Sequence, residues 1–153
     1  MANQFTERRR DDGQIAVLVL GLFVVVLVFI LGAIDVTSAQ LARMRLLDTA
    51  DSIALGAADA LDTRGVYGGG LEGPLVLTDE SVHEAAQGQL ARTPRPPGIS
   101  GWSLVDPTGT PDGATAEVTL RGHATLPMTG WILESLGGEV TITVTSRARA
   151  SLD

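Results

Sequence analysis

The chain contains no cysteine and no lysine, and aromatic residues make up only 4% of its 153 positions. The absence of cysteine excludes disulfides, thiolate metal sites and cysteine nucleophiles. All 11 basic residues are arginines and the net charge is -7, so the basic surface that nucleic acids require is missing. Deep ligand pockets are usually lined by aromatic side chains, which are scarce here. We therefore expect neither a nucleic-acid partner nor a small-molecule substrate.

The sequence also lacks a recognisable catalytic or metal-binding pattern. His83 and His123 are the only histidines, and neither has a second ligand at the spacing of a metal site. Ser100, Ser103 and Ser135 do not lie in the motif of a nucleophile elbow. We expect both histidines to be exposed to solvent, and we expect a non-enzymatic protein with no cofactor and no metal ion.

One long apolar block dominates what is present. No charged residue occurs from Ile15 to Ile34, and Val, Leu, Ile and Phe fall on every face of a helix formed by this block. Twenty helical residues at about 1.5 Å each span roughly the 30 Å hydrocarbon layer of a bilayer. So small a chain has too little other apolar surface to bury such a helix. The sequence predicts a single transmembrane helix over residues 15–34.

The charges beside this helix predict its orientation. Three arginines precede it, at positions 8–10, whereas Arg43 and Arg45 follow at some distance. Basic residues favour the cytoplasmic side, so residues 1–14 are expected to form a cytoplasmic leader and the C-terminal part to lie outside the cell membrane. A cleaved secretory signal remains an alternative, because Thr37-Ser38-Ala39 offers small residues where signal peptidase cuts, giving a start at Gln40.

The helix is expected to continue outside the membrane over residues 35–62. This stretch has no proline and carries an apolar stripe of small residues, widened by Leu47 and Leu61, which together predict an amphipathic helix ending near Thr63-Arg64-Gly65 and the glycines at 68–70. The stripe is a candidate helix-packing interface, either with the chain's own sheet or with other subunits. Its members are Leu46, Ala50, Ile53, Ala54, Ala57 and Ala60.

Asp35 stands directly after the apolar block. Such a carboxylate could pair with an arginine of a neighbouring subunit and fix the axial register of an assembly. The alternative is that it marks the boundary of the membrane.

Residues 63–153 are expected to form one small domain. Thr78 has the properties of an N-cap for a helix that ends at Thr93-Pro94. Alternating patterns predict three strands in a meander, with turns at residues 106–109 and 111–113. A short helix over Leu126–Leu136 is expected to direct Trp131, Ile132 and Leu136 inward. The fold class is α+β, a small antiparallel sheet with short helices. The predicted strands are Trp102–Val105, Ala116–Leu126 and Val140–Ala148.

The N-terminal part resembles a known family. The order RRRDDGQIAVLVLGL, an apolar span, and then AIDVTSAQLARMRLLDTADSIALGAADALD is similar to the N-terminal module of TadE/TadG-like proteins of tight-adherence (Flp) pilus systems, particularly the actinobacterial form. The likeness covers roughly residues 1–62. The end of the chain, LRGHATLPMTGWILESLGGEVTITVTSRARASL, is similar to the general pattern with which such proteins close.

This resemblance implies a structural or assembly component of an Flp-type pilus or related secretion system. Such a protein would be a minor pilin, a pseudopilin or a membrane-anchored assembly factor, with the membrane, other machinery subunits and self-association as its partners. The resemblance also implies a processing junction at Gly13-Gln14, although the Glu expected shortly after such a junction is missing. The alternative function is a membrane-anchored, extracytoplasmic binding module that never joins a filament.

Overall fold

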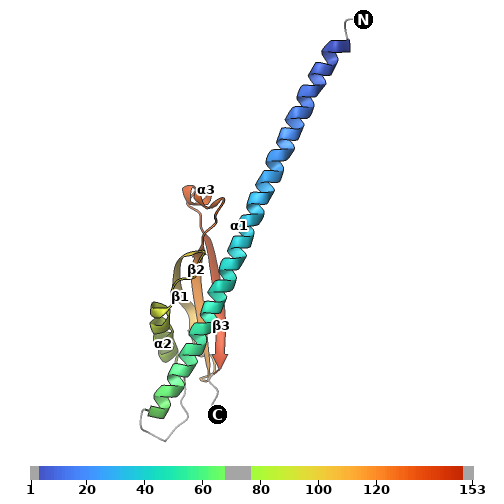
Figure 1. The fold of residues 1–153 in the computed structure, drawn as a ribbon. Coiled ribbons are helices and arrows are strands. Elements are labelled where there is room, and N and C mark those ends of the chain that lie inside the picture. The colour runs from blue at the N-terminus through green and yellow to red at the C-terminus, as the bar shows by residue number, and fades with distance from the viewer. Residues whose placement is uncertain (1–3, 68–76, 150–153) are drawn as a thin grey trace.

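One helix, α1 (Gln4–Tyr67), runs through most of the molecule (Figure 1). The computed structural model describes the backbone of residues 4–67 and 77–149, and the side chains of residues 13–59 and 77–149. With 64 residues at about 1.5 Å each, α1 is roughly 96 Å long. The helix is described through Tyr67, so it continues past Gly65, because a lone glycine weakens a helix without ending it. The predicted turn at Gly68, Gly69 and Gly70 lies outside the described residues.

The second layer is the predicted antiparallel meander. Strands β1 (Ile99–Gly109), β2 (Thr115–Ala124) and β3 (Val140–Arg149) follow the order β1-β2-β3. The pairs Leu104 with Leu120 and Leu120 with Val144 set the register across the three strands. A long helix with a small antiparallel sheet and short helices confirms the predicted α+β class.

The two predicted turns before β2 differ in outcome. At the second, the Asp112 Oδ1 accepts hydrogen bonds from the N–H groups of Ala114 (3.0 Å) and Thr115 (2.7 Å), which closes a tight turn. The first, at residues 106–109, is instead the irregular end of β1, where the register shifts between Val105 and Gly109. The Thr119 hydroxyl donates to the Pro107 carbonyl at 2.6 Å and helps to hold this irregular segment against β2.

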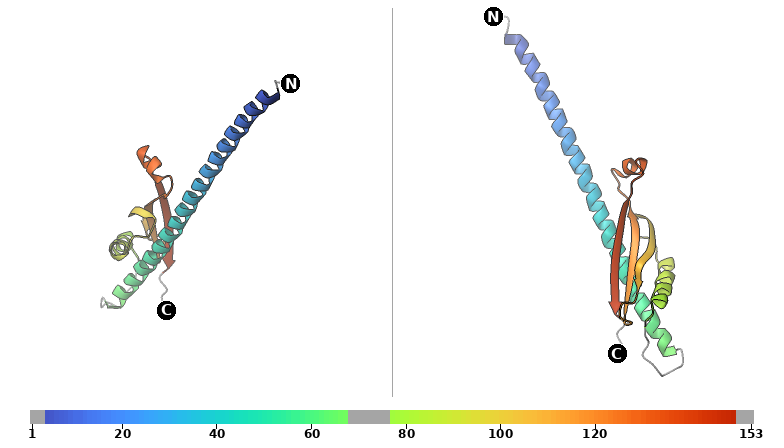
Figure 2. Two further views of the ribbon diagram at one scale, coloured as in Figure 1. Left: turned by 45° about the horizontal axis from the view of Figure 1, so that its top comes forward. Right: turned by 180° about the vertical axis from the view of Figure 1, so that it is seen from behind.

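The core lies between α1 and one face of the sheet (Figure 2). Alternate residues of β2 and β3 point toward the helix and are buried, including Val118, Leu120 and Val144. Leu46 and Ile53 are the large α1 side chains that face them, and both are fully buried. The opposite face of β3 is exposed and rich in threonine, as the alternation of its sequence predicts.

Helix α2 (Asp79–Arg92) completes the core beside α1 and β1. The predicted N-cap is confirmed, because the Thr78 hydroxyl accepts from the Ser81 N–H and the Ser81 hydroxyl accepts from the Thr78 N–H. Val82 and Ala86 are buried on its inner face. Gly56 of α1 lies against the Gln89 side chain, so the small residue permits the two helices to approach closely.

The short helix α3 (Gly130–Ser135) follows β2 and precedes β3 in the chain, and it lies beyond the end of the sheet. Its predicted inward side chains are not inward: Trp131 is 71% exposed, Leu136 79% and Ile132 42%. The prediction failed because α3 projects past the last sheet residues, Ala124 and Val140, where no second layer exists to cover it.

Candidate helix interface and membrane boundary

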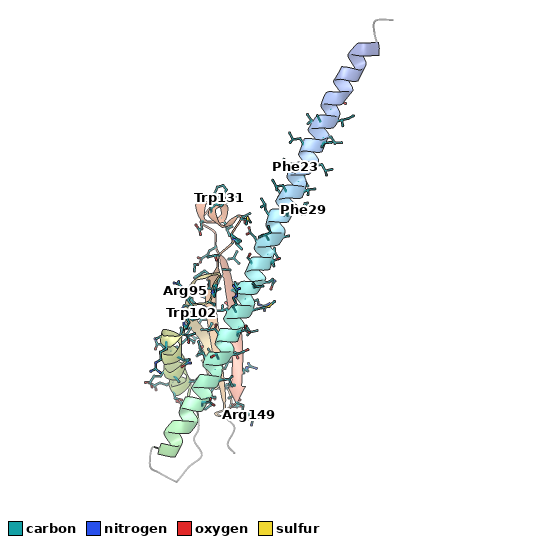
Figure 3. All side chains as sticks on the ribbon, in the orientation of Figure 1. Phe23, Phe29, Arg95, Trp102, Trp131 and Arg149 are labelled. Atoms are coloured by element: carbon teal, nitrogen blue, oxygen red, sulfur yellow. The ribbon has the colours of Figure 1, made fainter. Side chains whose placement is uncertain are left out.

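The apolar half of α1 is exposed and is not covered by the rest of the described chain. A window of 18 residues within Gly13–Asp59 has a mean hydropathy of 3.3, and none of that window is buried inside the chain. Phe23 and Phe29 are 61% and 75% exposed, and Figure 3 shows them on the part of α1 that extends away from the domain. Within the described residues this is the one helix long and apolar enough to cross a membrane, which indicates single-pass membrane anchoring.

The predicted small-residue stripe of α1 is occupied by the chain's own domain. Leu46, Ala50, Ile53, Ala54 and Ala57 are all 0% exposed, and they belong to one cluster with residues of α2 and the sheet. Contact is close: a Cβ added at Gly122 of β2 would lie 3.1 Å from the Leu46 Cδ2. The Ala60 side chain lies outside the described residues. Of the two kinds of packing considered for this stripe, the structure contains the one within the chain.

A second set of apolar side chains on α1 is exposed outside the core. We call it the outer face, and its residues lie between Val36 and Leu55, beyond the apolar span. Sequence reasoning missed it, since Leu47 was assigned to the buried stripe and the others were not singled out. The available signal was the apolar spacing of three residues among the polar positions. The outer face consists of Val36 (63% exposed), Leu41 (44%), Met44 (59%), Leu47 (39%) and Leu55 (56%).

Asp35 connects the end of the apolar span to residues far along the chain, at the start of α3. We call residues 128–136, which comprise α3 and its flanking residues, the α3 segment. It is 4% exposed, and its carboxylate accepts hydrogen bonds from the N–H groups of Met128 (2.9 Å) and Thr129 (2.8 Å). The Thr129 hydroxyl donates to the same carboxylate. Thr129 is the N-cap of α3 and makes no capping bond with its own side chain. Asp35 therefore places a negative charge at this helix start, bonded to the N–H groups of the N-cap residue and of the residue before it.

These hydrogen bonds favour the charged form of Asp35. Burial opposes ionisation, but the bonds from the Thr129 hydroxyl and from the Met128 and Thr129 N–H groups together hold the pKa of the carboxyl below its usual value. Within the described residues the partners of Asp35 thus belong to its own chain. The predicted role in fixing the register between subunits stays a prediction.

Replacing Asp35 with asparagine is expected to release α3. The asparagine would present an amide NH₂ to one of the two N–H donors, so at least one donor loses its partner. Hydrogen exchange at the Met128 and Thr129 amides measures this directly, and we expect their protection to fall at least tenfold. Asp48→Asn, at an exposed position of the same helix, is the matched control and should change neither amide. Unchanged protection in Asp35→Asn would show that the bond network does not hold α3.

Lowering the pH should have the same local effect as Asp35→Asn, namely weaker protection of the Met128 and Thr129 amides against hydrogen exchange. Because the pKa of Asp35 is lowered in the folded chain, its contribution to stability is present above the ordinary aspartate pKa and is lost as the pH falls through the lower folded value. The pKa of Asp112 is lowered as well, chiefly by the hydrogen bond from the Ala114 N–H. The exchange of the Met128 and Thr129 amides separates the two groups, because Asp112 does not contact α3.

Two pairs of oppositely charged or titratable side chains lie on or beside the sheet. Arg147 donates from Nε to the buried Glu117 carboxylate at 2.6 Å, across a directly opposed pair of β3 and β2. His83 is exposed as predicted, whereas His123 is half-buried and lies 3.2 Å from the Glu139 carboxylate. Residues 13–59 and 77–149 contain no group of three His, Asp or Glu side chains able to hold a metal ion.

The predicted processing junction lies inside α1. Gly13 and Gln14 are both exposed, and the helix continues through them without interruption. A Cβ added at Gly13 would meet no atom within 4 Å, so packing in this chain does not account for the glycine.

Comparison with known proteins supports the resemblance seen in the sequence. Residues 13–60 match the family model described as "Putative Flp pilus-assembly TadE/G-like". The match begins at Gly13 and covers the apolar span, Asp35, the buried stripe up to Ala60 and the outer face. No match was found among curated proteins or among solved structures. Residues 13–60 of this chain are therefore similar to the TadE/G-like Flp pilus-assembly family, and the rest of the chain lies outside the match.

Proposed function

We propose that this protein is a structural or assembly component of an Flp-type pilus or a related secretion system, acting as a pseudopilin-like subunit or a membrane-anchored assembly factor. The observation that carries the proposal is the outer face of α1. It places exposed apolar side chains at positions 36 to 55, beyond a membrane span, on a helix whose buried stripe is already occupied by the chain's own domain. A rigid helix with one free apolar face is suited to packing against other subunits, and it needs no cofactor and no catalysis.

The position of Asp35 also supports a chain that is not cleaved after Ala39. Cleavage there would remove Asp35, whose carboxylate is buried and holds the start of α3. We propose that residues 15–34 stay attached as a single-pass anchor, with the leader 1–14 in the cytoplasm and the folded part outside the cell membrane, as the arginines at positions 8–10 favour. Residues 35–62 and 63–153 then act as one unit, because Leu46 and Ile53 belong to the core of the domain.

Site-specific photocrosslinking in native membranes tests the proposed interface. A photoreactive residue at Met44, on the outer face, is expected to crosslink to another pilus-machinery subunit or to a second copy of this chain. The same residue at Gln87, exposed on α2, is the matched control and should give at least several-fold less of the same product. Mass spectrometry of the product identifies the partner.

The competing function predicts the reverse pattern. In a binding module that never joins an assembly, α1 serves only as an anchor and its outer face meets no protein. Crosslinks from Gln87 to an envelope protein, with none from Met44, would overturn the assembly role. Both positions are exposed, so neither replacement should disturb the fold, and circular dichroism of the purified variants checks this.

A further inference from the structure

The α3 segment carries an apolar surface that its own chain leaves uncovered. Trp131 and Leu136 are 71% and 79% exposed, and Ile132 and Met128 are 42% and 39% exposed. The Trp131 indole donates to the Met128 carbonyl at 3.2 Å, which satisfies its polar edge and leaves the rest of the ring outside. In a domain with a small core, so much exposed apolar surface on one short segment indicates contact with something apolar.

The position of α3 is fixed relative to the membrane span. Asp35 is the residue next to the span's last residue, Ile34, and it holds the Met128 and Thr129 backbone at 2.9 and 2.8 Å. Figure 1 shows α3 at the end of the sheet nearest the apolar half of α1, and Figure 3 shows Trp131 at that same end. Whatever depth residue 35 has at the bilayer edge, the start of α3 has nearly the same depth.

We propose that α3 is a second membrane contact, in which Trp131, Ile132 and Leu136 enter the headgroup boundary of the leaflet where the span ends. The inference rests on the membrane anchoring in the proposed function and adds to it. Tryptophan favours this boundary because its ring is apolar while its N–H is polar. A single helix leaves the domain free to rotate and tilt, whereas two points of contact fix its orientation on the membrane.

Charge decides which kind of lipid surface fits. The α3 segment and its flanks carry Glu134 and Glu139 and no basic residue between Leu126 and Glu139. Anionic headgroups would repel these carboxylates, since attraction to such membranes requires lysine or arginine. The contact is therefore apolar and independent of anionic lipid, and vesicles of zwitterionic phosphatidylcholine are a sufficient probe.

Fluorescence quenching by brominated phosphatidylcholine tests the contact in the full chain. The protein has two tryptophans, so Trp102→Phe leaves Trp131 alone, and Trp131→Phe leaves Trp102 alone on β1. We expect lipids brominated near the carbonyl end of the acyl chain to quench Trp131 several-fold more than Trp102. A third variant, Phe23→Trp in a chain lacking both native tryptophans, reports on the span and should respond most to deep bromines.

The three variants separate failure of this inference from failure of the anchor. If Phe23→Trp is quenched and Trp131 is quenched no more than Trp102, the α3 contact is overturned while the anchor stands. If Phe23→Trp is not quenched, the anchor fails and the contact fails with it. If Trp131 is shielded from aqueous acrylamide but not quenched by lipid, another protein covers α3 and the lipid contact is likewise overturned.

Discussion

Replacing Leu46 with alanine is expected to lower the free energy of unfolding of the domain by about 2–5 kcal/mol, the range for a fully buried leucine. Leu46 is 0% exposed and lies where α1 crosses β2, next to Gly122. The space left behind cannot collapse easily, because α1 is a rigid helix held at both sides by the sheet and α2. This should be among the most damaging single replacements in the domain.

Leu47→Ala is the matched control, since it makes the same chemical change one residue along the same helix. Leu47 is 39% exposed on the outer face, so its loss should cost less than about 1 kcal/mol. Under the proposed function, Leu47→Ala should instead reduce assembly. Urea unfolding of the full chain in lipid nanodiscs, followed by Trp102 fluorescence in a Trp131→Phe background, measures both. Equal stability losses would contradict the assignment of the two faces.

The buried face of α1 could be predicted because its periodicity is strict. Leu46, Ala50, Ile53 and Ala57 recur at spacings of four and three, which leaves one side of a helix apolar. Periodicity says that a face is buried but not by what, so packing within the chain and packing between subunits stayed open until the sheet was placed. Leu47 sits at the edge of that stripe, where a change of a few tens of degrees decides between core and surface.

The exposure of the α3 segment could not be predicted from the local sequence pattern. The spacing of Trp131, Ile132 and Leu136 suits a helix with one apolar side, and a soluble domain would turn that side inward. Here the segment extends beyond the sheet, and its apolar side has no protein layer to meet. The hydrogen bonds of Asp35 could not be predicted from the sequence either, because their donors lie 93 and 94 residues further along the chain. Only tertiary structure joins the edge of the span to a distant helix start.

Gly122→Ala should also destabilise the domain, by roughly 1–2 kcal/mol. The added Cβ would lie 3.1 Å from the Leu46 Cδ2 and 3.2 Å from the Ile99 Cγ2, tighter than most packed Cβ contacts, so these side chains would have to shift by a few tenths of an ångström. Overpacking of this kind typically costs about 1–3 kcal/mol. The loss is offset by up to about 1 kcal/mol because alanine restricts the unfolded chain more than glycine does. Gly88→Ala is the control: its Cβ meets nothing within 4 Å, and in the middle of α2 it should stabilise by up to about 1 kcal/mol.

Combining Gly122→Ala with Leu46→Ala isolates the contact between β2 and α1. Once Leu46 is shortened, the new methyl group enters the space that the leucine side chain occupied, so the second replacement should become neutral or stabilising. A double-mutant cycle from the same urea unfolding curves should then give a coupling of about 0.5–3 kcal/mol, in the sense that the double variant is more stable than the two single losses predict. Additive losses would mean that Leu46 does not face Gly122, and that α1 crosses the sheet at another residue.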